Sequence, residues 1–304
     1  MEKRVIKKVI KNPLVAVARV WMKMSPWISS SELYLKVLYR LKTGHKLNLE
    51  HPVTFNEKMQ WLKLHSTDPL YTTLADKYEV RKFVADRIGE EYLIPLIGVY
   101  DRLEDIDFEA LPNQFVMKTT HDSGSIVICK DKTSFDIEKA RKKITNSLKY
   151  EYYYKGREYP YKNIKHRIVV EQYMEDKETG ELTDYKFFCF NGKPEMIFVA
   201  SERFAGKGVV KFTYFDMDYN VLPIHSSGHD NSKTLAKPDC FDEMVKVLNK
   251  LCLDLPFIRI DLYAINHKVY FGEYTFFHDG GIVNLEPDEW NYKLGEKIHL
   301  PIDK

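Results

Sequence analysis

The sequence predicts an α+β protein in which most strands pair antiparallel. Helical periodicity dominates the first third of the chain, whereas short strand-like runs separated by turn signals dominate the rest. Asn191-Gly192, a dipeptide preferred in tight hairpin turns, stands between two such runs. The regular strand–helix alternation of a doubly wound sheet is absent. With 304 residues, 44% of them hydrophobic, the chain is long enough for two domains or one two-lobed body.

Three segments of the first third predict helices. Apolar residues recur at helical spacing over residues 34–41 and 80–88, and each segment is followed by a glycine, a typical helix stop. Between them, Thr54 and Glu57 form a capping box that opens a helix expected to reach His65. Residues 29–105 are therefore expected to form a helical N-terminal region.

The rest of the chain predicts strands, hairpins and two more helices. Ser134 is expected to cap a helix that reaches Lys149, and Asp239 a helix whose apolar face ends at Cys252. The strand-like runs cover residues 115–119, 125–130 and 167–174, and the hairpins are expected over residues 184–200, 210–224 and 257–277.

Charge is distributed unevenly along the chain. The formal net charge is only +2, which argues against a dedicated nucleic-acid binder and predicts no nucleic-acid partner. Residues 1–24, however, carry seven Lys and Arg against Glu2 alone, whereas the other 280 residues hold 39 basic and 43 acidic groups. Residues 1–28 read as a basic amphipathic arm, interrupted near Pro13, that either contacts an anionic membrane surface or packs on the body.

The cysteines and the hydropathy pattern indicate the compartment. The four cysteines show no CxxC spacing and read as buried free thiols, as expected in a reducing cytoplasm. No apolar run approaches the roughly 20 residues that span a bilayer. We therefore expect a cytoplasmic protein, with peripheral contact at the inner face of the plasma membrane if the arm binds lipid.

The hairpin over residues 257–277 is the most informative segment. Alternation places Arg259 and Asp261 on one face of the first strand, and Glu273 and Thr275 on one face of the return strand. If the loop has three residues, 266–268, Asp261 lies opposite Glu273 and Arg259 opposite Thr275. A two-residue loop would instead turn Glu273 to the other face.

Two carboxylates and an arginine on one sheet surface suit phosphoryl chemistry. Close carboxylates repel one another unless a cation lies between them. Carboxylate oxygens with open positions suit Mg²⁺ that is shared with nucleotide phosphates. Arg259 would then stabilise charge on a transferring phosphoryl group. The alternative is a surface hairpin with one ordinary salt bridge.

Other segments add weaker indications of a nucleotide site. Lys118 precedes a small polar turn, His121 to Gly124, whose backbone N–H groups can cradle phosphate. The apolar strand that begins near Ile168 ends in acids, so its backbone can face a purine and a carboxylate can face a ribose; the alternative is a strand followed by a polar loop. Six tyrosines between Tyr150 and Tyr161, with cations among them, suit an acceptor groove or a packed surface flap.

Taken in order, these motifs resemble the ATP-grasp enzymes, and more closely the TupA-like ATP-grasp family. The general series is Asp76-Lys77, Lys118 with its loop, Glu171-Gln172-Tyr173, Asp184-x-Lys186, Arg259-x-Asp261 and Glu273-x-Thr275. The closer matches are Phe-Asn-Glu-Lys at 55–58, Ala-Asp-Lys-Tyr at 75–78, the His-Asp-Ser-Gly turn, Arg-Glu-Tyr-Pro-Tyr-Lys at 157–162 and Gly-Glu-Tyr-Thr-Phe-Phe at 272–277. The resemblance covers about residues 30–300.

The resemblance implies two α+β lobes that grip ATP between antiparallel sheets. It implies a catalytic unit over residues 106–304, with lobes at about 106–176 and 177–304. It implies ATP and Mg²⁺ as cofactors, with the following roles. The phosphates would be contacted by Lys77, Lys118, Ser123, Gly124 and more weakly Lys186, while His121 would touch phosphate or cap its loop. Adenine would be lined by Glu171, Gln172 and Tyr173, and ribose would lie near Glu175 or Asp176. The catalytic residues would be Arg259 and Lys118, and the metal ligands Asp261, Glu273 and Thr275. Thr275 departs from the usual Glu-x-Asn and offers one oxygen without an amide.

The resemblance also implies a function in the assembly of bacterial surface polysaccharides. The ATP-grasp reaction would phosphorylate a carboxylate, and an amine would then displace phosphate to form an amide. The expected partners are a carboxylated glycan or precursor and an amine. Three alternatives remain: a glycan kinase on the same scaffold, a glycosyltransferase and a non-catalytic binding module.

Overall fold

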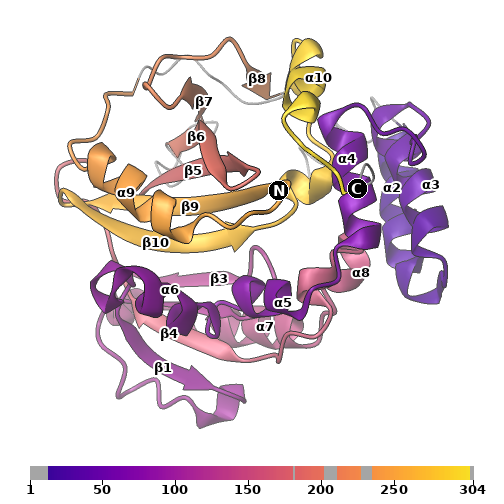
Figure 1. Ribbon diagram of the computed structural model, residues 1–304. Helices are drawn as coiled ribbons and strands as arrows, with labels where there is room; N and C mark the ends of the chain where they lie inside the picture. The colour runs from indigo at the N-terminus through magenta and orange to yellow at the C-terminus, as the bar shows by residue number, and fades with distance from the viewer. Residues whose placement is uncertain (1–12, 181, 202–210, 227–234, 302–304) are drawn as a thin grey trace.

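The computed structural model describes residues 13–180, 182–201, 211–226 and 235–301, and it is built around two larger antiparallel sheets. The five-stranded sheet has the order β10-β9-β5-β6-β7 and the four-stranded sheet the order β1-β4-β2-β3, and the two lie one above the other in Figure 1. Every strand pairing within them is antiparallel. The predicted α+β class is therefore confirmed.

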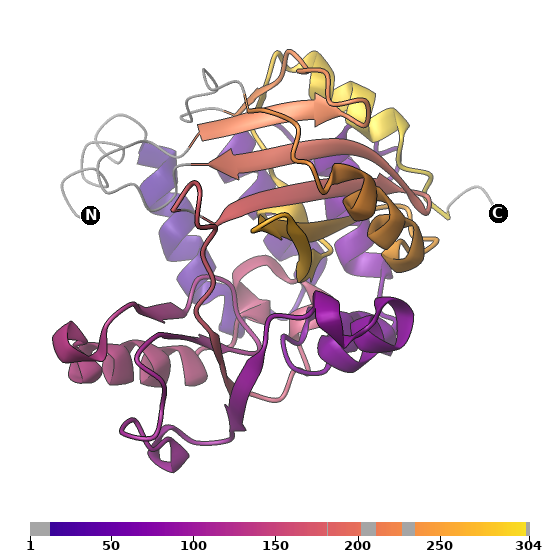
Figure 2. The ribbon, with the colours of Figure 1, turned by 90° about the vertical axis from the view of Figure 1, so that its left-hand side faces the viewer.

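Helices flank both sheets (Figures 1 and 2). The helices are α2 (Pro13–Met24), α3 (Ser31–Thr43), α4 (Phe55–His65), α5 (Pro69–Ala75), α6 (Val80–Ile88), α7 (Ile137–Leu148), α8 (Tyr153–Gly156), α9 (Phe241–Leu251) and α10 (Glu289–Glu296). The strands are β1 (Leu96–Tyr100), β2 (Phe115–Thr119), β3 (Ile126–Cys129), β4 (Ile168–Gln172), β5 (Thr183–Phe190), β6 (Lys193–Ser201), β7 (Lys211–Asp216), β8 (His225–Ser226), β9 (Ile258–Ile265), β10 (Lys268–Thr275) and β11 (Leu285–Glu286).

The local signals that predicted the first helices are present in the structure. Helix α3 ends at Gly44 in the left-handed conformation, where glycine has no Cβ penalty. At the start of α4, the side chain of Thr54 accepts from the N–H of Glu57, and the Glu57 carboxylate accepts from the N–H of Thr54. Residues 96–100, within the region expected to be helical, instead form β1, which pairs with β4. The division of the chain at residues 28, 105 and 176 stays a prediction.

Two predicted helix caps are wrong. Asp136, not Ser134, caps α7, because its carboxylate accepts from the N–H of Lys139 at 2.9 Å. Helix α9 begins after Cys240 without a side-chain cap. Asp239 instead lies 2.7 Å from Nδ1 of His267 in the turn between β9 and β10.

The hairpin predicted over residues 210–224 is only partly formed. Strand β7 pairs with β6, but the segment after it makes a single bridge, between Phe215 and Val221. The Asp216 carboxylate accepts from the N–H groups of Asp218 and Asn220 and so closes a local turn in place of a ladder. The hairpin β5–β6 turns at Asn191-Gly192 as predicted, with both residues at positive φ.

The described part of the N-terminal arm packs on the body by one face only. Ala18 of α2 is buried against the core of α3, and Nε1 of Trp21 donates to the carbonyl of Tyr34. The opposite side leaves large apolar side chains in solvent: Val17, Val20, Met24 and Trp27 are 45–81% exposed. Residues 1–12 lie outside the described part. No helix in the described part is long and apolar enough to cross a membrane. The four cysteines are free thiols, and three are buried.

Candidate active site

A cavity of about 670 Å³ opens between the two sheets. Its walls come from the end of β2 and the β2–β3 loop on one side, and from β5, β9 and β10 on the other. The cavity collects nine of the residues predicted to form the site: Lys77, Lys118, Ser123, Gly124, Lys186, Arg259, Asp261, Glu273 and Thr275. Residues far apart in the sequence therefore meet in one space.

The β9–β10 hairpin reaches the expected register by an unexpected route. Its loop has two residues, Asn266 and His267, both at positive φ, yet Glu273 does not turn to the other face, so the expectation for a two-residue loop is wrong. A β-bulge at Gly272 restores the register, since Phe271 pairs with Leu262 and Glu273 pairs with Asp261. A Cβ at Gly272 would lie 3.0 Å from the carbonyl oxygen of Asp261, so this close approach favours glycine. The bulge returns Glu273 to the face of Asp261.

Arg259 joins the two carboxylates of this hairpin. Its Nε lies 2.6 Å and its Nη2 2.8 Å from the two oxygens of Asp261, and the same Nη2 lies 3.1 Å from Oε1 of Glu273. Thr275 donates to that Glu273 oxygen at 3.2 Å. Asp261 is buried, whereas the side chain of Glu273 is 42% exposed. Glu273 thus presents a carboxylate to the cavity while Arg259 holds Asp261 in place.

Lys186 of β5 pairs with two carboxylates. Its Nζ lies 2.6 Å from Asp184 and also pairs with Asp261 on the neighbouring strand. Burial would raise the pKa of Asp261, but the charges of Arg259 and Lys186 outweigh burial and hold that pKa well below its usual value. From the sequence, Asp184 had no predicted role of its own in the Asp184-x-Lys186 pair. Side chains two residues apart on a strand share a face, and this signal places Asp184 on the same face as Lys186.

The donor set fits Mg²⁺ that is shared with phosphate. Within the described residues, no group of three or more His, Cys, Asp and Glu is placed to hold a metal by itself. Mg²⁺ in phosphoryl-transfer sites commonly takes one or two carboxylates and completes its shell with phosphates and water. Asp261 and Glu273, paired across the strands and facing the cavity, match that requirement. Thr275 is an additional neutral oxygen beside them.

His278 was not predicted as a site residue, yet it contacts the central arginine. It is buried, and its Nδ1 accepts from Nη1 of Arg259 at 2.7 Å. Burial and the Arg259 charge lower the pKa of His278 to about 3. The ring therefore stays neutral and acts as an acceptor that orients the guanidinium.

This histidine predicts acid sensitivity of the fold. The unfolded chain has a His pKa of about 6.5, so it takes up a proton first as the pH falls, and stability is lost from about pH 6.5 down to about pH 3. Between pH 7 and pH 5 the wild type should lose about 2 kcal/mol of unfolding free energy through His278. His278→Gln should remove that part of the loss in urea titrations at both pH values. Equal losses in the two proteins would contradict this assignment.

Lys118 does not face the cavity as a free cation. Its Nζ lies 2.6 Å from the Glu171 carboxylate of neighbouring strand β4, and Nη1 of Arg81 lies 3.3 Å from the other oxygen. Glu171 is buried and does not line the cavity. The carboxylate predicted to contact adenine is thus engaged in positioning Lys118 at the cavity wall.

The β2–β3 turn is organised by Asp122. Its carboxylate accepts from Thr119 at 2.7 Å and from Ser147 at 2.6 Å, and also from Ser125. These contacts fix the loop that carries Ser123 and Gly124 to the cavity. His121 is fully buried, and its Nε2 lies 3.1 Å from the carbonyl of Ser147. Of the two expectations for His121, its position favours stabilisation of its own loop.

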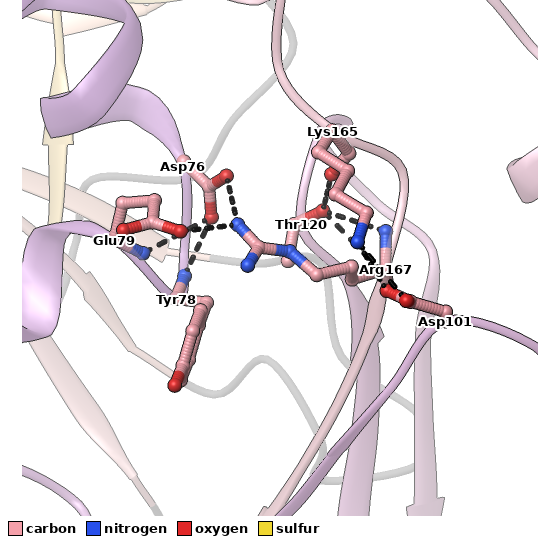
Figure 3. A network of polar contacts seen from close by, with 7 residues as sticks. All are labelled: Asp76, Tyr78, Glu79, Asp101, Thr120, Lys165 and Arg167. Carbon is pink, nitrogen blue, oxygen red and sulfur yellow. Dashed lines mark hydrogen bonds and ion pairs between the residues drawn. The ribbon is translucent and has the colours of Figure 1, made fainter.

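Lys77, which lines the cavity, follows Asp76, and Asp76 takes part in the polar network of Figure 3. Asp76, which is 2% exposed, accepts from the N–H groups of Tyr78 and Glu79 and from Arg167 at 3.0 Å. Arg167 also reaches Glu79 at 2.7 Å (Figure 3). Nζ of Lys77 donates to the carbonyl of Asp122, and burial lowers the pKa of Lys77. The network thereby joins the α5–α6 corner to the β2–β3 loop.

Loss of Arg167 should loosen this corner. Arg167→Met leaves Asp76 buried without its cation, so we expect a loss on the order of 3 kcal/mol in stability and about tenfold weaker ATP binding. Urea titration and calorimetric ATP binding measure the two effects. The control is Lys165→Met, which removes an exposed pair with Asp101 in the same region (Figure 3) and should cost less than about 0.5 kcal/mol. Similar behaviour of the two variants would contradict the role of Arg167.

Four other predicted residues, Gln172, Tyr173, Glu175 and Asp176, lie outside the cavity lining. Gln172 is exposed, and the hydroxyl of Tyr173 donates to Glu175. Asp176 accepts from the N–H groups of Glu178 and Asn266 and so ties its own turn to the β9–β10 loop. Their roles at adenine and ribose stay predictions.

Several residues that line the cavity were not predicted as site residues from the sequence. Lys42 and Lys63 lie on predicted helices, where charged residues usually face solvent. Glu158 appeared only as a letter of a matched motif. Their common position depends on tertiary packing between α3, α4 and the segment after α8, which local periodicity does not report.

Comparisons with known proteins give one family match. A family model described as TupA-like ATPgrasp matches residues 57–299. No curated protein matches the chain.

Solved structures provide more distant similarities. D-alanine–D-alanine ligase from Bacillus anthracis with ATP is 14% identical, with 67% of this chain and 55% of that chain covered and a TM-score of 0.37. N5-carboxyaminoimidazole synthetase from Staphylococcus aureus with ADP is 14% identical, with coverages of 73% and 52% and a TM-score of 0.40. The ATP-grasp ligase PsnB with a minimal precursor, Mg and ADP is 7% identical, with coverages of 72% and 57% and a TM-score of 0.38. The chain spans little more than half the length of each of these structures.

Proposed function

The chain belongs to the TupA-like ATP-grasp family, and from this premise we propose which bond it forms. We propose that it joins an amine to a carboxylated glycan or glycan precursor through an acyl phosphate, with ATP and Mg²⁺. Membership confirms the predicted fold, and the ligase activity is proposed together with its substrates. The proposal concerns the two substrates and the setting in surface polysaccharide assembly.

The observation that carries the proposal is the charge pattern of one cavity. Four cations, Lys77, Lys118, Lys186 and Arg259, line it together with the paired carboxylates Asp261 and Glu273. Cations suit a polyphosphate, and carboxylates suit its metal. No cysteine lines the cavity among the described residues, which fits a reaction without a cysteine nucleophile.

Each cavity residue has a role in this proposal. Lys77 and Lys118 reach the cavity from one side and Lys186 from the other, so they would hold the phosphates between them. Arg259 would neutralise charge on the γ-phosphate as it moves to the substrate carboxylate. Asp261 and Glu273 would hold Mg²⁺, which supplies charge neutralisation of the phosphates when bound. The protein contributes mainly position and charge.

The proposed reaction has two steps. A carboxylate oxygen of the acid attacks the γ-phosphorus of ATP, which forms the acyl phosphate and releases ADP. The neutral amine then attacks the acyl carbon, the C–O bond to phosphate breaks, and an amide and inorganic phosphate form as the amine loses a proton.

A substrate screen tests this proposal. ADP release is measured with ATP and Mg²⁺ for a panel of uronic acids, each with and without a mixture of amino acids. We expect one acid to support ADP release that rises with the amine and yields free phosphate. Tight ATP binding without acid-dependent ADP release for any uronic acid would count against the ligase. A phosphorylated sugar in place of free phosphate would identify the kinase.

We also propose that helix α2 brings the enzyme to an anionic membrane. Val17, Val20 and Met24 lie on its exposed side, and Trp27, 81% exposed, follows at its end. Residues 1–24 carry seven basic residues against one acidic residue, which complements anionic headgroups. Surface polysaccharides are assembled at membranes, so this location suits the proposed setting.

Vesicle binding measures this contact. The protein should sediment with vesicles that contain 30% phosphatidylglycerol. At 0.15 M salt, roughly tenfold less protein should sediment with pure phosphatidylcholine vesicles. Val20→Asp with Trp27→Ala should reduce binding about tenfold, because an apolar anchor is lost. The exposed Val53→Asp, on another part of the surface, is the control. Equal binding of all three proteins would contradict the proposal.

A further inference from the structure

The cavity continues beyond the residues proposed to hold the phosphates of ATP. Its second end is lined by Met22, Leu38, Lys42, Lys63, Lys155 and Glu158. These come from α2, α3, α4, α8 and the segment after α8, the helices grouped beside the two sheets in Figure 1. None of these residues belongs to the phosphate-facing set described above.

Glu158 is a buried carboxylate without a direct partner. It is 6% exposed, and within the described part of the chain no hydrogen bond and no ion pair reaches its side chain. A Cβ at Gly156 would lie 2.6 Å from its Oε1, and one at Gly280 would lie 3.5 Å away, so the carboxylate packs against two glycine backbones. Burial raises the pKa of Glu158, and nearby lysines lower it in part. A buried acceptor of this kind suits a donor from a ligand.

Three lysines surround that carboxylate. Lys63 is 5% exposed, and its Nζ donates to the carbonyl of Gly280 at 2.6 Å, beside Glu158. Lys42 and Lys155 line the same end with their side chains open to the cavity. Burial lowers the pKa of Lys63 to about 8, since the opposing effect of the Glu158 charge is smaller and the Lys42 charge lowers it further. Asp279 also lines the cavity and its charge acts on Lys42, so the three lysines face two carboxylates and one positive charge stays without a protein anion.

Two tyrosines stand between this end and the phosphate-facing residues. Burial raises the pKa of Tyr161, and both Glu158 and Glu273 raise it further. Burial likewise raises the pKa of Tyr152, with contributions from the same two carboxylates. Both tyrosines line the cavity. A ligand at the second end therefore lies next to the place where the carboxyl group would be activated.

We propose that this end binds the amine substrate and that this substrate is an amino acid. Glu158 accepts from its ammonium group, and Lys42, Lys63 and Lys155 bind its carboxylate. A simple amine would leave the lysines without an anion, and a simple acid would leave Glu158 without a donor. This assignment rests on the proposed ligase reaction, because it names the second substrate of that reaction.

Binding to the wild-type protein tests the ligand class. The probes are the twenty standard amino acids, measured by calorimetry in the presence of ADP and Mg²⁺. For the tightest binder, the matching amine without the carboxylate and the matching acid without the amino group are compared. We expect each truncated analogue to bind at least tenfold more weakly. No binding by any amino acid, or equal binding by an analogue, would overturn the proposal.

Variants test the residues. Glu158→Gln and Lys155→Met should each raise the KM for the amino acid at least tenfold, and Lys155→Met, on an exposed side chain, keeps the test valid if the buried variant does not fold. Lys36→Met, on α3 and paired with Glu32 in solvent, should leave the KM unchanged. An unchanged KM in Lys155→Met and in folded Glu158→Gln would overturn the assignment.

Hydroxylamine separates failure of this assignment from failure of the ligase. It replaces the amine but carries no carboxylate, so hydroxamate formation reports the acyl phosphate alone. We expect the ratio of amino-acid product to hydroxamate to fall at least tenfold in Glu158→Gln. If the wild type forms hydroxamate but the ratio is unchanged, the amine site is elsewhere. If the wild type forms no hydroxamate with any acid, the ligase proposal itself has failed.

Discussion

Asp261→Asn is expected to lower kcat about 10³-fold or more and to abolish the response to Mg²⁺. Asp261 meets Glu273 across the hairpin, and its two oxygens contact Arg259. The amide keeps the shape but loses the charge that binds a metal and holds the guanidinium in line. ADP release at saturating ATP, measured across a Mg²⁺ titration, gives the size of the effect.

The same substitution should leave the protein folded. It removes one charge from a buried network, which costs on the order of 3 kcal/mol, less than the usual stability of a chain this long. Circular dichroism and urea titration check this point. Asp86→Asn, which removes an exposed carboxylate paired with Lys82, is the matched control and should keep full activity. Substantial Mg²⁺-dependent turnover by folded Asp261→Asn would overturn the metal assignment.

Arg259→Lys is expected to lower kcat about 10²-fold while the positive charge is kept. The guanidinium makes two contacts with Asp261 and one each with Glu273 and His278. A lysine ammonium cannot reproduce this planar fork, so the charge would no longer be held at the cavity wall. The KM for ATP should change less than kcat, because the residue acts on the transferring phosphoryl group.

Arg102→Lys is the matched control for that variant. Arg102 also contacts an aspartate, Asp105, with two nitrogens, but the pair lies in solvent. Exposed pairs contribute little, so this substitution should change neither kcat nor stability measurably. A kcat for Arg259→Lys equal to that of the control would contradict a role for Arg259 in charge stabilisation.

The sequence predicted the local elements of the site well. Period-two alternation placed Arg259 and Asp261 together, and the Asn191-Gly192 turn placed β5 beside β6. The Asp261–Glu273 register is as expected, but only because the bulge at Gly272 compensates for a shorter loop. A single glycine in a strand hints at a bulge, yet its presence and position depend on how the two strands meet.

The sequence did not predict which distant segments would contact one another. Glu171 was expected to face a nucleotide, but in the structure it pairs with Lys118 and with Arg81, ninety positions away. Lys63 and Glu158 line one cavity although they belong to different elements, α4 and the segment after α8. Local periodicity identifies which face of an element is apolar, but it does not state which buried charges will share a space.

Oxygen transfer tests the central proposal most directly. For the uronic acid that supports ADP release, both carboxylate oxygens are labelled with ¹⁸O and the released phosphate is analysed by mass spectrometry. A ligase that works through an acyl phosphate transfers one ¹⁸O to each phosphate and leaves the other in the amide. Unlabelled phosphate, or phosphate that remains attached to the sugar, would contradict carboxylate activation by this protein.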